Sequence, residues 1–333
     1  MILRRHSHAT RDETTTPAAF RAIQSAVVGM YSRHPSPSRK DKLEFASTRM
    51  ELRLRFCGVS GEDYVGRDVL DAGCGTGEYS CWFASRGSRV TGIDLSDESL
   101  KEAQAYARAA GLKGIRFVKQ SVLQSGFPDE SFDFVYCTGV LHHTPDPFRG
   151  LTELTRLVRP GGKILVSLYN SFGFAPRELR RQLTLRLGGE RLEERVHWGR
   201  RLFPFTTRRL LEGPRNDPEA ALYDYFAIPH ETLHSLGEVL RWFDQLGLEY
   251  VGSFAPARAR DYPALVGHRA YKKVDRPLYS PILALLARLS SLSTSPEFER
   301  PGPLSRLLVQ IVWLLCGIGV FCLCGRKPRV GYA

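Results

Sequence analysis

The chain has 333 residues, of which 43% are hydrophobic, and a formal net charge of +12. This length and apolar content support one large α/β domain with insertions and exclude a low-complexity chain. The charge comes largely from arginines, many of them between Arg177 and Arg215. This positive charge is consistent with a solvated basic face, or with binding to anionic substrates, membrane headgroups or nucleic acid. No RNA-binding motif with interleaved aromatic residues accompanies it.

The seven cysteines are scattered, odd in number and without zinc spacing. This pattern indicates reduced thiols in a cytoplasmic protein. The first residues offer no apolar run long enough for a signal peptide. Residues 1–40 are predicted to be a partly disordered segment, with disorder in the first fifteen and a short helix from Pro17 to Met30. An amphipathic helix is expected from Asp41 to Cys57.

An apolar strand that starts at Asp68 runs into a turn holding Gly73, Gly75 and Gly77, and a helical stretch follows to Gly87. Strand, glycine turn and helix together build a nucleotide crevice at the carboxyl edge of a parallel sheet. Glycine tolerates positive φ and lets a ligand approach the backbone with no Cβ in the way. The turn is therefore predicted to be the centre of a ligand site.

The spacing of the glycines separates two classes of cofactor. A dinucleotide site takes G-x-G-x-x-G, with the pyrophosphate at the helix N-terminus. Here the glycines stand at 73, 75 and 77, and Asp71 precedes them, where a carboxylate would repel a pyrophosphate but suits an ammonium group. Asp94, at the end of the next strand, is placed to accept hydrogen bonds from a ribose diol. Ammonium, ribose and no phosphate describe S-adenosylmethionine (SAM).

Four motifs follow one another along the chain: Val69-Leu-Asp-Ala-Gly-Cys-Gly-Thr-Gly77, Gly92–Ser96, Phe132–Val135 and Leu157–Leu165. In order and spacing they resemble those of class I SAM-dependent methyltransferases, in the branch that includes quinone-biosynthesis and many small-molecule enzymes. The resemblance is strong over 65–170 and weaker to 255. It implies an α/β fold with a seven-stranded, mostly parallel sheet, helices on both faces, an antiparallel strand seven, a helical N-terminal lid and an inserted basic cap.

The resemblance also implies how the chain is divided. The methyltransferase domain would cover 41–333, with its core at 65–170, the cap insertion at about 170–230 and C-terminal helix and strands at 231–333. SAM is the implied cofactor. Asp71 would meet its methionine ammonium, Asp94 its ribose, and Ser121 with Val122 would flank its adenine. The complete set of expected cofactor contacts is Asp71, Gly73, Cys74, Gly75, Gly77, Asp94, Leu95, Ser121, Val122 and Thr138.

Two groups of residues are candidates for catalysis. His142 and His143 follow the fourth strand and either support the crevice floor or act as a base. No acid or cysteine nearby completes a ligand set, so no metal is expected. Asp224 and His230 lie in the aromatic stretch 223–231, which either lines the acceptor pocket or caps a helix over 232–246.

The expected reaction is methyl transfer from SAM to a small-molecule acceptor by in-line displacement, with an oxygen, nitrogen or carbon nucleophile left open. An NAD-dependent oxidoreductase is less favoured because of the glycine spacing. A membrane-associated protein that acts on a lipid-linked acceptor or as a scaffold is a further alternative. Nucleic acid is not expected as a partner, because Thr138-Gly-Val-Leu141 replaces the tetrapeptide typical of amide-nitrogen methylation.

The apolar stretch from Leu307 to Cys324 has two interpretations. At eighteen residues it is at the lower edge of the ~17–25 residues that span a bilayer. Two glycines divide it, however, into a piece that fits a buried helix (304–315) and a piece that fits strand seven (320–324). We favour helix and strand in a cytoplasmic protein, with membrane association through this stretch and the basic insertion as the alternative. A further helix is predicted over 277–292.

Overall fold

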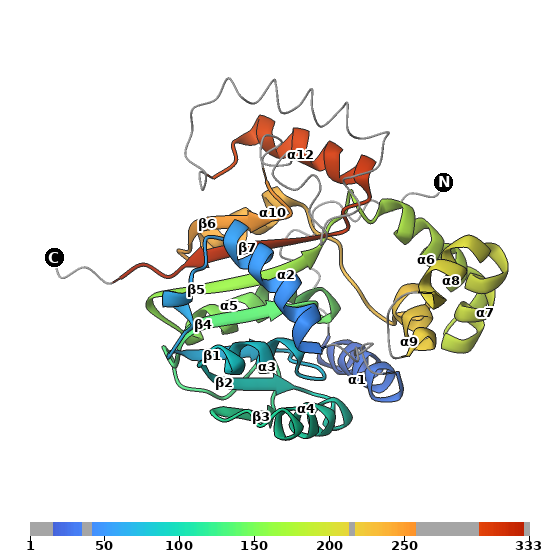
Figure 1. Ribbon diagram of the computed structural model, residues 1–333. Coiled ribbons are helices and arrows are strands. Elements are labelled where there is room, and N and C mark those ends of the chain that lie inside the picture. Colours follow the sequence, from blue (N-terminus) through green and yellow to red (C-terminus); the bar gives the residue numbers. More distant parts are fainter. Residues whose placement is uncertain (1–15, 35–41, 213–216, 258–299, 330–333) are drawn as a thin grey trace.

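The computed structural model describes residues 16–34, 42–212, 217–257 and 300–329 (Figure 1). Seven strands form one sheet in the order β3-β2-β1-β4-β5-β7-β6. Strands β1 to β5 run parallel, and β7 pairs antiparallel with both β5 and β6. The predicted α/β sheet with an antiparallel strand seven is confirmed. The strands are β1 Asp68–Ala72, β2 Arg89–Asp94, β3 Ile115–Lys119, β4 Phe132–Thr138, β5 Val158–Tyr169, β6 Glu249–Phe254 and β7 Val320–Arg326.

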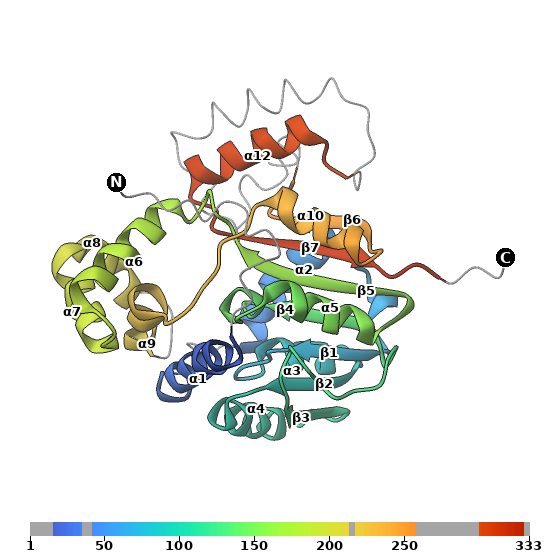
Figure 2. The same cartoon turned by 180° about the vertical axis from the view of Figure 1, so that it is seen from behind.

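Helices cover both faces of the sheet (Figures 1 and 2). Helices α2 and α3 pack on one face, where Val69 and Phe134 are buried with Trp82. Helices α5, α10 and α12 pack on the other, over Leu70 and Val135. Neighbouring strand residues point to opposite faces, so continuous apolar runs fill both layers. The bounds are α2 Lys42–Phe56, α3 Glu78–Ser85, α4 Asp97–Ala109, α5 Pro147–Leu157, α10 Leu236–Gln245 and α12 Pro303–Cys316.

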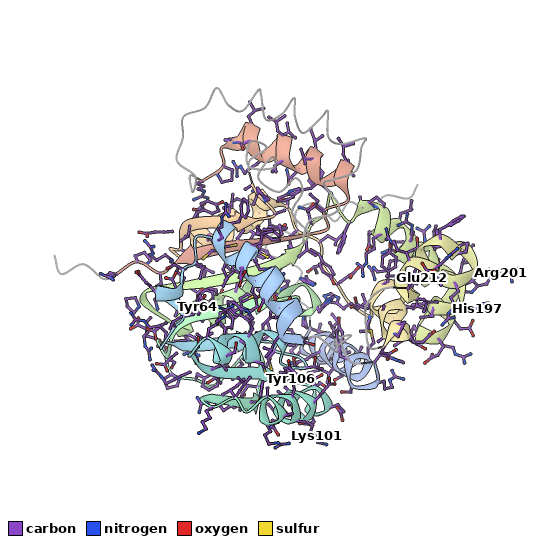
Figure 3. The ribbon with its side chains drawn as sticks, in the orientation of Figure 1. Tyr64, Lys101, Tyr106, His197, Arg201 and Glu212 are labelled. Atoms are coloured by element: carbon purple, nitrogen blue, oxygen red, sulfur yellow. The ribbon has the colours of Figure 1, made fainter. Side chains whose placement is uncertain are left out.

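A helical cap follows β5 and lies beside the carboxyl edge of the sheet, together with helix α1 (Figure 1). Its small core contains Val196, Leu222 and Phe226. His197, Arg201 and Glu212 point outward from it (Figure 3). The cap elements are α6 Ala175–Gly188, α7 Leu192–Leu202, α8 Pro204–Leu211, α9 Pro218–Leu222 and the π-helical turn η3 Tyr223–Ala227, and α1 spans Pro17–Arg33.

Two expected boundaries change. The helix predicted over 232–246 begins at Leu236, because Ser235 and Glu238 form a capping box there. The helix predicted to end at Met30 continues to Arg33. The first fifteen residues and the helix predicted over 277–292 lie outside the described residues.

The tail forms the favoured helix and strand, α12 and β7. The expectation that this helix is buried is wrong for one of its sides. Val309 and Trp313 are fully buried, whereas Leu307 on the opposite side is 52% exposed. A continuous apolar run cannot indicate which side of a helix meets the core. Among the described helices, none has both the length and the apolar character that crossing a bilayer requires.

Candidate functional site

The turn after β1 has a backbone that only glycine adopts easily. Gly73, Gly75 and Gly77 all have positive φ, at 77°, 51° and 84°. A Cβ on Gly73 would lie 2.2 Å from a methyl of Val140, and one on Gly77 would lie 2.8 Å from the Cβ of Ala103. Around Gly75, by contrast, a Cβ would meet nothing within 4 Å. Two glycines therefore permit close packing, and the middle one faces open space.

Asp94, at the end of β2, is fixed beside this turn. Its Oδ2 accepts a hydrogen bond of 2.9 Å from the Gly75 N–H, and its Oδ1 accepts one of 2.9 Å from the Ser96 N–H. A carboxylate oxygen accepts more than one hydrogen bond, so both oxygens keep capacity for a ligand. Backbone donors hold the carboxylate still and leave it able to receive two hydroxyls.

Asp71 lies behind the turn. It is 2% exposed, and its Oδ2 accepts a 2.5 Å hydrogen bond from the Ser80 hydroxyl. Burial raises the pKa of the Asp71 carboxyl to about 7, although the Ser80 hydrogen bond acts against this. Asp71 is not among the residues that line the pocket described next. The contact of Asp71 with a ligand ammonium stays a prediction. What the structure shows is that the hydrogen bond between Asp71 and Ser80 links β1 to α3.

A pocket of about 370 Å³ opens at the carboxyl ends of the parallel strands. This is where open α/β sheets bind their ligands. Its walls come from the glycine turn, the ends of β2 and β4, the segment after β3, and helix α1. The predicted cofactor residues that line it are Gly73, Cys74, Gly75, Asp94, Leu95, Ser121, Val122 and Thr138.

The wall that follows β3 is mostly apolar. Val122 and Leu123 are 7% and 5% exposed, and both line the pocket. The Ser121 hydroxyl accepts a 3.2 Å hydrogen bond from the Leu123 N–H. A flat apolar ligand portion fits this wall better than a charged one.

The paired histidines have different positions. His142 is fully buried, does not line the pocket and stacks on Tyr169 with ring centroids 3.6 Å apart. His143 does line the pocket, and its Nδ1 donates to the His230 carbonyl at 3.2 Å. That bond leaves Nε2 as the acceptor nitrogen. Burial lowers the pKa of His143 to about 4, so the ring is neutral at pH 7 and is a better hydrogen-bond acceptor than proton carrier.

The other two catalytic candidates do not line the pocket but contact residues that do. Asp224 accepts a 3.2 Å hydrogen bond from the hydroxyl of Tyr31, and Tyr31 lines the pocket from α1. The His230 ring donates from Nε2 to the Thr144 carbonyl at 3.2 Å. Neither Asp224 nor His230 lines the pocket itself. Of the four candidates, only His143 meets the pocket directly.

Arg53 is a pocket residue that the sequence analysis missed. It comes from α2, and its Nη1 donates to the Tyr136 hydroxyl. Its Nε is buried and has no hydrogen-bond partner among the described residues. An unpaired buried donor beside a pocket indicates a site for a ligand anion. The available signal was an arginine between Met50 and Cys57 on the apolar side of an amphipathic helix.

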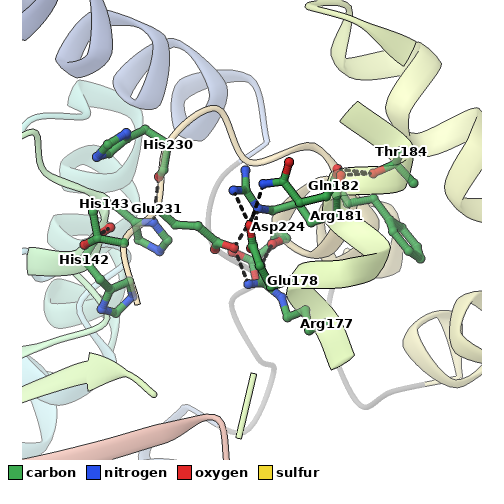
Figure 4. A network of polar contacts seen from close by, with 12 residues as sticks. His142, His143, Arg177, Glu178, Arg181, Gln182, Thr184, Asp224, His230 and Glu231 are labelled. Carbon is green, nitrogen blue, oxygen red and sulfur yellow. Dashed lines mark hydrogen bonds and ion pairs between the residues drawn. The ribbon is translucent and has the colours of Figure 1, made fainter. Parts of the chain in front are cut away.

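A buried ion-pair network joins the cap to the pocket floor (Figure 4). Arg177 of α6 donates from Nη1 to Glu231 at 2.6 Å and from Nη2 to the Asp224 carbonyl at 2.9 Å. Its guanidinium also lies 5.3 Å from the Tyr169 ring centroid. Burial raises the pKa of Glu231 despite the attraction of Arg177 and Arg181. The network holds the segment that carries His230 against His143.

A larger cavity of about 680 Å³ lies at the opposite ends of the strands. Four of its charged lining residues form ion pairs, Arg159 with Asp133 at 2.8 Å and Lys163 with Asp63 at 2.8 Å. Paired charges offer little to a ligand. The smaller pocket at the carboxyl edge is therefore the candidate site. Within the described chain no cluster of three or more potential metal ligands occurs, and its six described cysteines are free.

The sheet order, the antiparallel β7 and the glycine-lined crevice define a class I methyltransferase fold. Residues 70–166 match the family described as "Methyltransferase domain". These residues include most of β1, the glycine turn, the strands β2 to β4 and most of β5. The chain therefore contains a methyltransferase domain with the class I fold.

Curated relatives match over part of their length. A ubiquinone biosynthesis O-methyltransferase of Paracidovorax citrulli is 45% identical over 107 residues, which is 32% of this chain and 44% of that protein. An uncharacterized protein of Synechococcus is 32% identical over 198 residues, or 55% of this chain and 48% of that protein. The chain thus spans about half the length of these relatives.

Among solved structures, a phosphoethanolamine N-methyltransferase of Haemonchus contortus, in complex with phosphomonomethylethanolamine and S-adenosylhomocysteine, aligns with a TM-score of 0.48 at 16% identity. The alignment covers 94% of this chain and 61% of that one.

Proposed function

We propose that the protein transfers the methyl group of SAM to a small-molecule acceptor. The observation that carries the proposal is the Asp94 carboxylate, held by two backbone N–H groups on the wall of the pocket. It suits a ribose diol and disfavours a phosphate. The methyltransferase domain and the O-methyltransferase relatives support the same assignment.

The pocket residues divide into groups that fit different parts of SAM. Asp94 would accept hydrogen bonds from the ribose, and the wall at Ser121 and Val122 would contact the adenine. Arg53 would bind the carboxylate of the amino-acid portion. Gly75, where a Cβ would meet nothing within 4 Å, leaves room for the ligand against the backbone. Two features of the site support this fit: the absence of a Cβ at the turn and the buried Nε of Arg53 that lacks a partner among the described residues.

SAM, when bound, supplies a methyl group already activated by its sulfonium. The protein's main task is then to hold the acceptor atom in line. Neutral His143, with Nε2 as acceptor, would orient an acceptor hydroxyl or amine by a hydrogen bond, and Tyr31 bounds the same part of the pocket. The low pKa of His143 makes it a poor store for a proton, so we assign it to orientation of the acceptor.

The proposal is tested by calorimetric titration of the full chain with S-adenosylhomocysteine and, in parallel, with NADH. We expect S-adenosylhomocysteine to bind and NADH not to bind. Asp94→Ala should abolish binding, while Asp97→Ala, which changes a surface carboxylate three residues later, should leave it unchanged. Unaltered affinity in Asp94→Ala would show that the site assignment is wrong, and binding of NADH alone would favour the oxidoreductase.

A further inference from the structure

One side of α12 presents aliphatic side chains to solvent. Leu307, Ile311 and Leu314 follow one another at helical spacing and are 52%, 44% and 41% exposed. The same side also carries Leu304, Leu308 and Leu315, which are 69%, 37% and 44% exposed. A surface helix normally turns polar or charged residues to this side. We call these six residues the outer face of α12.

The opposite side of α12 is fixed in the core. Val309, Val312 and Trp313 are at most 2% exposed, and Trp313 stacks on Phe321 of β7 with ring centroids 5.4 Å apart. A helix of 14 residues is about 21 Å long, which is less than the ~30 Å hydrocarbon core of a bilayer. The helix is therefore suited to lie against an apolar phase, not to cross one.

Positive charge accompanies this helix. A Cβ on Gly237 would lie 3.5 Å from Arg306 Nη1 and 3.8 Å from Arg241 Nη1, so the two guanidinium groups are neighbours between α10 and α12. Of the two acids on α10, Asp244 pairs with Arg300 at 2.7 Å, and Glu238 accepts from the Ser235 N–H at 3.3 Å and lies 3.2 Å from His234 Nδ1. The whole chain carries a net charge of +12. Arg306 is seven residues before the buried Trp313, so it lies on the α10 side of the helix, and together with Arg241 it flanks the outer face without forming part of it. Aliphatic side chains with cationic groups at their flank match the surface of an anionic bilayer.

We propose that the outer face of α12 docks on the surface of an anionic phospholipid bilayer. A second copy of the chain is a poorer occupant. A helix face about 21 Å long and ~10 Å wide offers roughly 200 Å², whereas a stable interface needs about 800 Å² from each partner. An interfacial helix needs only its apolar side and nearby cationic groups. The inference goes beyond the proposed methyl transfer and does not depend on it.

The outer face of α12 is close along the chain to a residue of the pocket. Helix α12 ends at Gly317, and Val320, the first residue of β7, is 38% exposed and lines the pocket. Four residues separate Leu315 from Val320, so their Cα atoms are at most about 18 Å apart. Docking would therefore bring the pocket mouth close to the bilayer, within reach of an acceptor held there.

Co-sedimentation with vesicles tests the proposal. The full chain is mixed with vesicles of phosphatidylcholine alone or with added phosphatidylglycerol. We expect binding to the anionic vesicles that weakens with salt. The triple variant Leu307→Gln, Ile311→Gln, Leu314→Gln should bind at least about tenfold more weakly, because three aliphatic side chains that would enter the bilayer are replaced by polar ones. Val65→Gln, at a residue 50% exposed elsewhere, is the matched control and should bind like the wild type.

Two results would overturn the proposal. The first is a wild-type chain that does not bind anionic vesicles, and the second is a triple variant that co-sediments with them as well as the wild type does. Concentration-dependent dimerisation lost in the triple variant, without vesicle binding, would assign the face to a second copy instead. Circular dichroism and titration with S-adenosylhomocysteine check that the variants fold. A wild type that binds vesicles but not S-adenosylhomocysteine would contradict the proposed methyl transfer and leave the docking surface supported.

Discussion

Two carboxylates, Asp71 and Asp94, lie near the carboxyl ends of the neighbouring strands β1 and β2, and their surroundings give them different tasks. Asp94 accepts from two backbone N–H groups on the pocket wall. Asp71 is buried behind the glycine turn with the Ser80 hydroxyl as donor. Backbone donors stabilise a charged carboxylate, while burial favours the protonated form. One group is therefore prepared to receive a ligand, and the other links β1 to α3.

The Asp71 carboxyl should make stability depend on pH. Its pKa of about 7 in the folded protein lies above the ordinary value of 3.8, so the native state binds more protons than the unfolded chain between these pH values. The free energy of unfolding then falls as pH rises from about 4 to about 7, by a few kcal/mol. Asp71→Asn should remove this fall. Urea denaturation across the range measures it, with surface Asp97→Asn as control, and parallel curves for wild type and Asp71→Asn would contradict it.

Arg53 should select the amino-acid end of the ligand. Its buried Nε has no partner among the described residues, and a carboxylate would supply one. Arg53→Met should weaken S-adenosylhomocysteine binding by about 10- to 100-fold, the value of a hydrogen bond to a charged group. Binding of 5′-methylthioadenosine, which lacks the carboxylate, should change little. Arg55→Met, on the exposed side of α2, is the control, and an equal loss for both ligands would refute the assignment.

At the scale of elements, α1 is joined to the cap across the pocket. Tyr31 donates to Asp224 of η3, and His34 stacks on Tyr223 with ring centroids 3.7 Å apart. Gln24, Val27 and Val28 also line the pocket from this helix. Helix α1 thus forms one wall of the site, and its position depends on contacts with a segment almost two hundred residues later.

Tyr31→Phe should loosen this wall. Loss of the hydroxyl removes one hydrogen bond, which is worth about 1 kcal/mol. We expect faster dissociation of S-adenosylhomocysteine in stopped-flow measurements and faster proteolytic cleavage within α1. Arg33→Ala, at the exposed end of the same helix, should leave both rates unchanged. Wild-type rates in Tyr31→Phe would mean that the contact with Asp224 does not hold the helix.

At the scale of the molecule, the sequence predicts those structural features whose residues lie close together along the chain. The glycine turn, the acid that ends β2 and the apolar run of β7 each lie within a few residues and imply the sheet and its crevice. Contacts between distant segments were not predictable in this way. Arg53 reaches the pocket from α2, and Tyr31 meets Asp224 only after the cap has folded back. The aliphatic outer face of α12 also escaped prediction, since an apolar run does not reveal which side packs.

Two buried arginines of the cap, Arg177 and Arg181, pair with Glu231 of the segment that leads back to the sheet, and this gives the broadest prediction. Arg177 and Glu231 are 7% and 0% exposed at their side chains and lie 2.6 Å apart. Arg181 Nε also lies 3.1 Å from Glu231, so among the described residues the buried carboxylate loses both cationic partners only in the double variant Arg177→Met, Arg181→Met. That variant should cost about 3–5 kcal/mol of unfolding free energy. The surface pair Arg208–Glu212 is the matched control, and Arg208→Met should cost less than about 1 kcal/mol.

Hydrogen exchange then separates a local effect from a global one. Because Arg177 holds the cap and the His230 segment, and its hydrogen bonds among the described residues reach neither β1 nor β2, protection should fall over 175–212 and 217–227 and persist over 68–94. S-adenosylhomocysteine should still bind, since Asp94 keeps its two backbone donors. Loss of protection in both regions together would show that the cap is part of a single cooperative unit with the sheet, and that the ion pair supports the whole fold.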